Sequence, residues 1–128
     1  MTSGSDQNIF MIDFCLEEIV IIRNAIKEVL NVIDDFEFQT RIGVECRRAV
    51  DFYRRLCGVL DNQIDGDNGL NFSCEEILII NNSLNEICNG VYIHDFENKI
   101  GVNRNCTRVL LDKAGFLFEN LCRCSCIY

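Results

Sequence analysis

The feature that most constrains the fold is an internal repeat, because residues 17–44 recur at 75–102, 58 positions later and without a gap. Twelve of these 28 aligned positions are identical. The hexapeptide Glu-Glu-Ile-Val-Ile-Ile at 17–22 returns as Glu-Glu-Ile-Leu-Ile-Ile at 75–80. Self-similarity at a fixed spacing indicates a duplicated structural unit. One copy alone has too few residues to bury a large core, so we expect the two copies to pack against each other.

Each copy shows the pattern of three helices. In the first copy, apolar residues recur at the spacing of one helical face, which predicts a long helix from a cap at Asp13 to about Asn31. A short helix at 37–42 and a third helix at 44–60 follow. Gly43 separates them, and glycine readily takes the left-handed conformation that ends a helix.

The second copy repeats this order. Ser73 and Glu76 form the pattern of a capping box at the start of a long helix that ends at Asn89–Gly90. A short helix at 95–100 and a last helix from about 103 to 118 follow. The chain contains no proline to interrupt these helices.

These patterns predict one all-α domain in which two tandem three-helix repeats (long helix, short helix, helix) pack with pseudo-twofold symmetry. Residues 1–10 are small and polar, and we expect a frayed end there. The expected boundaries are repeat one at about 13–60, a linker at 61–71, repeat two at about 72–118 and a Cys-rich tail at 119–128.

The formal net charge is −8, which disfavours nucleic acid and anionic membrane surfaces as partners. No apolar run approaches the roughly 20 residues of a membrane span. The first residues show no secretory signal pattern, so a cytoplasmic location is expected and the nine cysteines are expected to be reduced thiols.

A polar stripe is kept in both long helices, on one helical face of each. One interpretation is a binding face; the other is that these side chains bond to the following turn or to the opposite repeat, and we favour the second. The residues are Asn24, Glu28 and Asn31, with Asn82, Glu86 and Asn89 in the second copy.

The order of short helix, glycine turn and helix around Gly43 is also that of a helix-turn-helix. The third helix carries four arginines that a DNA-binding protein would use, namely Arg47, Arg48, Arg54 and Arg55. The alternative is an ordinary helical corner. The second copy does not keep the basic cluster, and the overall acidity favours the corner.

Chemistry-bearing motifs are scarce. His94 is the only histidine, and a pair with Cys88 or Cys106 would be needed for thiol catalysis. The 61–76 segment is acidic but lacks the register of a calcium loop. Three tail thiols at Cys122, Cys124 and Cys126 could hold a soft metal such as zinc or copper(I), but they lack a fourth ligand and the usual spacing of a zinc site, so a plain tail is favoured. We therefore predict no enzyme activity, no cofactor and no metal.

Two segments, 79–90 and 95–102, resemble a recurring part of small bacterial proteins, often cyanobacterial, that have no known activity. They read Ile-Ile-Asn-Asn-Ser-Leu-Asn-Glu-Ile-Cys-Asn-Gly and Asp-Phe-Glu-Asn-Lys-Ile-Gly-Val. The first copy carries the companion version, Phe-Gln-Thr-Arg-Ile-Gly at 38–43. The resemblance implies a small helical protein of the cytosol and transfers no site residues.

The sequence favours a non-enzymatic protein-interaction module that binds another protein, for example an inhibitor or immunity-type protein that neutralises a basic enzyme. A helix-turn-helix regulator is the alternative function. A small enzyme or a ligand-binding homodimer is the third.

Overall fold

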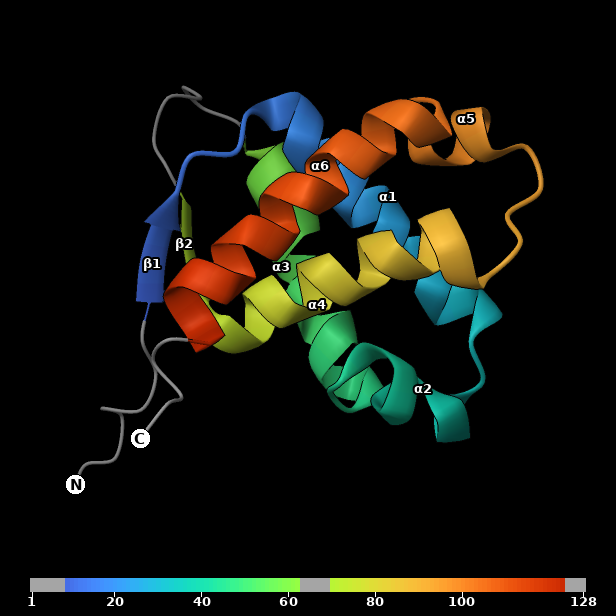
Figure 1. Ribbon diagram of the computed structural model, residues 1–128, viewed down its shortest axis with the longest axis horizontal. Coiled ribbons are helices and arrows are strands. Elements are labelled where there is room, and N and C mark those ends of the chain that lie inside the picture. The colour runs from blue at the N-terminus through green and yellow to red at the C-terminus, as the bar shows by residue number, and fades with distance from the viewer. Residues whose placement is uncertain (1–8, 63–69, 124–128) are drawn as a thin grey trace.

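The computed structural model of the chain describes residues 9–62 and 70–123 (Figure 1). Helices account for most of these residues, and one two-stranded sheet accompanies them. The all-α prediction is therefore confirmed in its broad form. Within the described ranges, no helix combines the length and the apolar character needed to cross a membrane.

The first three helices are α1 (Leu16–Val32), α2 (Asp35–Ile42) and α3 (Cys46–Asp61), in the predicted order. The start of α1 differs from the prediction, because Cys15 and not Asp13 occupies its cap position. The Cys15 backbone N–H donates to Glu18 Oε1 at 3.0 Å, and this bond places the cap three residues before the glutamate.

The second half contains α4 (Cys74–Asn85), the π-helical segment η2 (Glu86–Gly90), α5 (Phe96–Ile100), α6 (Arg104–Leu117) and the π-helical segment η3 (Phe118–Arg123). The predicted long helix does reach Gly90, but its last five residues widen into a π-helix. The first described residues of the predicted tail belong to η3, and residues 124–128, including Cys124 and Cys126, lie outside the described part.

Two short strands were not predicted. Strand β1 (Ile9–Ile12) pairs antiparallel with β2 (Leu70–Ser73), in a register that sets Ile12 against Leu70. Part of the expected frayed end and part of the expected linker are therefore ordered in a sheet. Four-residue strands are too short for a clear alternating pattern, and their pairing depends on a partner some 60 residues away.

The core lies between the two long helices and the helices that cover them. Helix α1 packs against α3 and α4, and α4 packs against α6 (Figure 1). The largest fully buried side chains are mostly isoleucines of α1 and α4, together with Phe38 of α2 and Phe72 of β2. Burying each such side chain stabilises the fold by roughly 1.5–3 kcal/mol.

Two asparagines join the halves of the molecule through matching hydrogen bonds. Asn24 Nδ2 on α1 donates to the Ile100 carbonyl at 2.9 Å, and Asn82 Nδ2 on α4 donates to the Ile42 carbonyl at 2.7 Å. Both carbonyls belong to the last residue of a short helix, where no intrahelical donor remains. The donors are 58 positions apart, and so are the acceptors.

The glycines that follow these two carbonyls are in the left-handed region, with φ of 101° at Gly43 and 109° at Gly101. This conformation turns the chain sharply from the short helix into the next helix. A Cβ atom at Gly43 would lie 2.9 Å from Leu78 Cδ2, whereas at Gly101 it would meet only Asn24 Nδ2, at 3.8 Å. Gly43 is therefore required both by backbone conformation and by the close approach of α4.

Replacing Asn82 with alanine is expected to destabilise the protein by about 1–2 kcal/mol, because the Ile42 carbonyl loses its side-chain donor. Chemical denaturation measures the loss. The matched control is Asn31→Ala in the same polar stripe, whose side chain is exposed. Equal stability of the two variants would contradict this assignment.

Alanine at Gly43 is expected to cost more stability than alanine at Gly101, since both have positive φ but only Gly43 also meets a side chain at 2.9 Å. Gly58, inside α3 with open space at its Cβ position, should give the opposite sign. Gly58→Ala is expected to stabilise by about 0.5–1 kcal/mol. Thermal unfolding of the three variants checks the order, and a Gly101→Ala variant less stable than Gly43→Ala would refute it.

Candidate functional site

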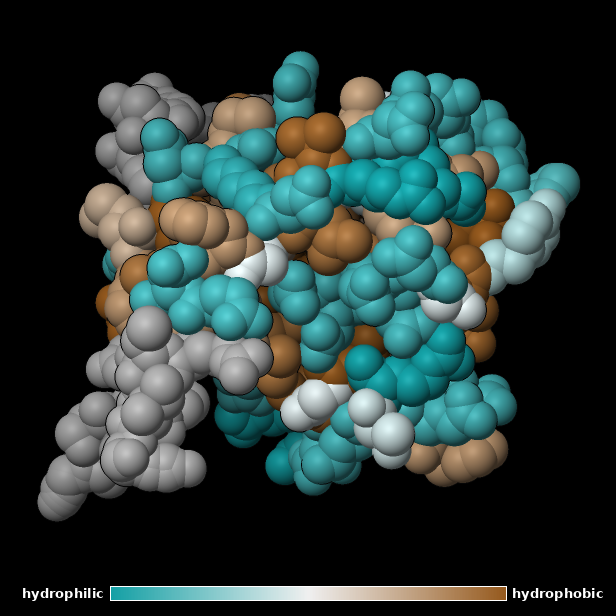
Figure 2. Space-filling model, viewed as in Figure 1, coloured by the Kyte–Doolittle hydropathy of each residue, from teal (hydrophilic) through white to brown (hydrophobic). Residues whose placement is uncertain are grey.

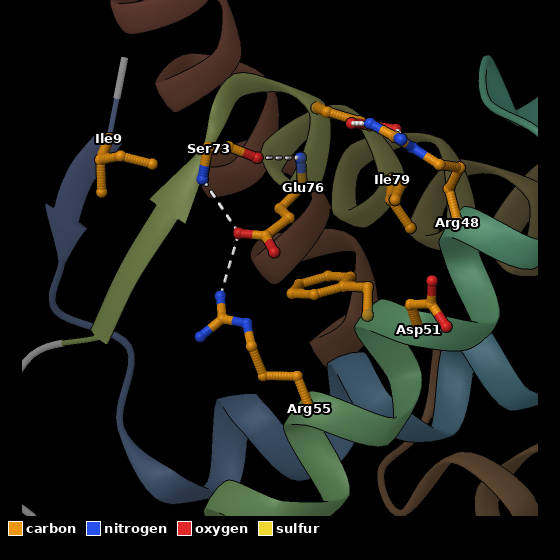
Figure 3. A pocket seen from close by; sticks show the side chains of 9 residues that line it. Ile9, Arg48, Asp51, Arg55, Ser73, Glu76 and Ile79 are labelled. Carbon is orange, nitrogen blue, oxygen red and sulfur yellow. Dashed lines mark hydrogen bonds and ion pairs between the residues drawn. The ribbon is translucent and has the colours of Figure 1, made fainter. Parts of the chain in front are cut away.

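A cleft of about 380 Å³ lies between α3 and the start of α4 (Figure 3). Its walls carry charged side chains from both helices, with Ile9 of β1 at one edge. Glu76 is the centre of this arrangement, since its carboxylate accepts from the Ser73 backbone N–H at 2.9 Å and from Arg55 Nη2 at 2.9 Å. The cleft is thus built around the capping box of α4.

The arginines of α3 that face this cleft are paired. Arg48 makes a two-pronged contact with Glu75, at 2.7 and 2.5 Å, and this bond lowers the pKa of the Glu75 carboxyl. Arg55 lies over the rings of Phe52 and Phe72, at 5.6 and 5.4 Å from their centres. A second hollow of about 470 Å³ shares Arg48 and Glu75 and extends toward α2.

A corresponding cluster occurs at the start of α1. Lys113 Nζ of α6 contacts Glu18 Oε1 at 3.0 Å and the Asp13 carbonyl at 3.3 Å, and lies 4.8 Å from the centre of the Phe14 ring. Each of these residues stands 58 positions from its counterpart in the other cluster, where the set is Arg55, Glu76, the Asn71 carbonyl and Phe72. Each clamp therefore ties the third helix of one half to the capping box of the other.

The four arginines predicted for the DNA-binding alternative do not form one basic face. Arg48 and Arg55 are paired with carboxylates of α4, and Arg47 lies 3.4 Å from Glu45. Arg54 is exposed on the outer side of α3. Bound carboxylates reduce the positive potential that a phosphate backbone needs, and Arg48 and Arg55 instead attach α3 to α4.

The predicted polar stripe is used mainly inside the molecule. Asn24 and Asn82 make the inter-half hydrogen bonds described above, and Glu86 accepts from Arg41 Nη2 at 2.5 Å. Glu28 is buried. These contacts agree with the favoured interpretation, in which the stripe bonds to the opposite repeat, and they leave the exposed Asn31 and Asn89 at the ends of α1 and η2.

The thiol–imidazole hypothesis gains no support from the geometry. His94 is exposed after η2, and no hydrogen bond joins it to Cys88 or Cys106 in the described residues. Burial raises the pKa of Cys88, which keeps it a thiol and a weak nucleophile. Groups of three or more metal-binding side chains are likewise not found within residues 9–62 and 70–123.

The segments that follow the two long helices lie toward one end of the molecule and expose apolar side chains there. Phe36 of α2 is 81% exposed and Tyr92 after η2 is 79% exposed, with Val32 at 45%. Arg41, at the end of α2, binds Glu86 of η2 and so joins α2 to the second long helix. Both connections lie at the right-hand end in Figure 1, and apolar side chains reach the surface there in Figure 2.

We call this region the turn-end surface and define it by its apolar residues and its carboxylates. Its members are Val32, Asp34, Asp35, Phe36, Glu37, Tyr92, Asp95 and Glu97. Neither 31–40 nor 89–98 contains a lysine or an arginine. Large apolar side chains combined with charge of one sign are a feature of protein-binding surfaces.

The sequence reasoning missed Phe36 and Tyr92, although a signal was present. Both aromatics stand outside the apolar pattern of the long helices, in the segments that follow these helices and that also carry carboxylates. At their repeat-equivalent positions stand His94 and Asp34, so neither is kept for the shared core.

Comparisons with protein-family models, curated proteins and solved structures found no match to this chain. The candidate site is therefore defined by its own geometry.

The Arg48–Glu75 pair predicts a pH effect. Because the folded-state pKa of Glu75 is lowered, its contribution to stability is present above the ordinary glutamate pKa of about 4.3 and is lost as pH falls through the lower folded value. Urea unfolding of Glu75→Gln should therefore differ from wild type at neutral pH, and the difference should shrink as pH falls below about 4.3 and through the lowered folded-state pKa. A constant difference across this range would show that the pair is not the cause.

Proposed function

We propose that this chain is a non-enzymatic, cytoplasmic protein-interaction module that binds a basic protein through the turn-end surface. The observation that carries the proposal is the pair of aromatic side chains, Phe36 and Tyr92, each about four-fifths exposed in a segment with carboxylates and no lysine or arginine. Exposed aromatics bury large area at low entropic cost when a partner covers them.

The charges around these aromatics determine the sign of the charge that the partner carries. Five carboxylates belong to the surface, and the nearest arginine, Arg41, is occupied by Glu86 and Glu37. With a net charge of −8, the molecule attracts a positively charged protein over about a Debye length and repels acidic ones. Such steering raises the association rate and selects the partner.

An inhibitor or immunity-type role is the concrete form of this proposal. In that role the turn-end surface covers the active-site cleft of a basic enzyme and blocks its substrate by occupancy. No catalytic group is needed on the present chain for this effect.

We further propose that the module consists of two repeats related by a pseudo-twofold axis. This proposal is supported by contacts that recur 58 positions apart, namely the two asparagine bonds and the two cation–carboxylate clamps. The pairing of Ile12 with Leu70 also supports it, because these are repeat-equivalent residues that lie opposite each other in the sheet. A twofold axis that passes between the two strands would place these equivalent residues opposite each other.

The test is affinity capture from host lysate with the wild-type chain and with the double variant Phe36→Ala/Tyr92→Ala. We expect one basic protein on the wild-type bait, in the presence of nuclease, and at least tenfold less on the double variant. Loss of two interface anchors of about 2 kcal/mol each accounts for this reduction.

Met11→Ala is the matched control, since Met11 is 71% exposed on β1 and lies outside the turn-end surface. Its capture should equal that of the wild type. For the purified partner, the association rate should fall as salt is raised from low to physiological concentration. Equal capture by wild type and the double variant, or an acidic captured protein, would refute the proposal.

A further inference from the structure

The outer side of α6 carries an apolar stripe that the fold does not cover. Val109 is 69% exposed and Phe116 is 67% exposed, and their spacing of seven residues places them on one face of the helix. Asp112 lies between them and is exposed. Phe116 also lines a groove of about 380 Å³ between α4 and α6. This stripe is separate from the turn-end surface.

The repeat-equivalent positions on α3 have complementary properties. Arg54 stands where α6 has Asp112, and Gly58 stands where α6 has Phe116. Arg54 is exposed, and no hydrogen bond or ion pair is found for it in the described part of the chain. A Cβ atom at Gly58 would meet no atom within 4 Å, so the surface beside it is open.

These two helix faces match in charge and shape at two positions, whereas Val109 of α6 would lie opposite the exposed Asp51 of α3. Arg54 and Gly58 are four residues apart on α3, and so are Asp112 and Phe116 on α6. Four residues correspond to about 6 Å along a helix. If α6 of one molecule lies parallel to α3 of another, Arg54 meets Asp112 while the Phe116 ring enters the open space beside Gly58.

From this complementarity we infer that α6 of one molecule docks on α3 of a second copy of the same chain. The contact is heterologous, since two different surfaces meet. A dimer therefore keeps one free α3 and one free α6, and association continues beyond a dimer unless the geometry closes a ring.

The contact is expected to be weak. One helix on each side buries less than the roughly 1,600 Å² of a standard interface, as in weak and transient complexes. The net charge of −8 opposes the approach of two copies at low ionic strength. Salt near 0.15 M shortens the Debye length to about 8 Å and reduces this repulsion, so association is measured there.

Sedimentation velocity of the purified full chain over a wide concentration range is the test. Wild type should show a mass-average sedimentation coefficient that rises with concentration. The charge reversals Arg54→Asp and Asp112→Arg should each weaken association at least tenfold, because each places like charges together. An equimolar mixture of the two variants should restore it, since Asp at 54 then meets Arg at 112.

Lys99→Asp and Glu17→Arg are the matched controls, because they make the same changes of charge at exposed positions of α5 and α1. Each should associate like the wild type. Phe116→Ala, which leaves the charges unaltered, should also weaken association. Circular dichroism confirms that every variant is folded.

Three results would overturn the inference. The first is a wild type that stays monomeric at all concentrations. The second is a pair of charge-reversed variants that associate like the controls. The third is a mixture that sediments as the sum of its separate components, which would exclude a direct contact between positions 54 and 112.

Discussion

The fold depends on two amide-to-carbonyl hydrogen bonds that cross between the halves of the molecule. Asn24 and Asn82 project from the central helices and satisfy the terminal carbonyls of α5 and α2. A buried carbonyl without a donor costs roughly 1–3 kcal/mol, so each bond stabilises the end of a short helix through a side chain of the opposite half. The two bonds therefore terminate the short helices and add to the cohesion that the shared core of α1 and α4 supplies.

The same exchange between halves determines the distribution of charge. The Arg55 side chain of the first half binds the capping glutamate Glu76 of the second half, and Lys113 of the second half binds Glu18 of the first. Arg48 and Arg41 are held by Glu75 and Glu86 in the same manner. These contacts use positive charge to join the helices, and Arg41 is shared between Glu86 and Glu37 of the turn-end surface. The acidity of the proposed interaction surface thus follows in part from how the halves are attached.

Differences between equivalent positions indicate where the two halves serve different purposes. The core positions are similar, as in Ile19 and Ile77, because both halves contribute to one interior. The outer faces differ, since Phe116 corresponds to Gly58 and Phe36 to His94. Surface residues that do not pack are free to diverge, and the exposed aromatics occur only at such divergent positions. Both proposed interaction surfaces belong to this class.

The sequence by itself determined the helical elements, because their signals are local. The 3–4 spacing of isoleucines, the Ser73–Glu76 capping box and Gly43 each act within one or two turns of chain, and the helices lie close to their predicted positions. The repeat also showed that Asn24 and Asn82 are kept at equivalent positions, although it did not show which carbonyls accept their hydrogen bonds. The predicted cap at Asp13 was wrong. The Glu18 carboxylate accepts from the backbone N–H of Cys15, three residues before it, and this bond does not depend on the side chain at position 15.

Only the tertiary structure decided which side chains meet across about 20 to 100 residues of sequence. It formed the sheet between β1 and β2, paired Arg48 and Arg55 of α3 with carboxylates of α4, and exposed Phe36 and Tyr92. The physical reason is that pairing and exposure depend on how whole helices are oriented against one another. That orientation results from the sum of many packing contacts, which no single stretch of sequence contains.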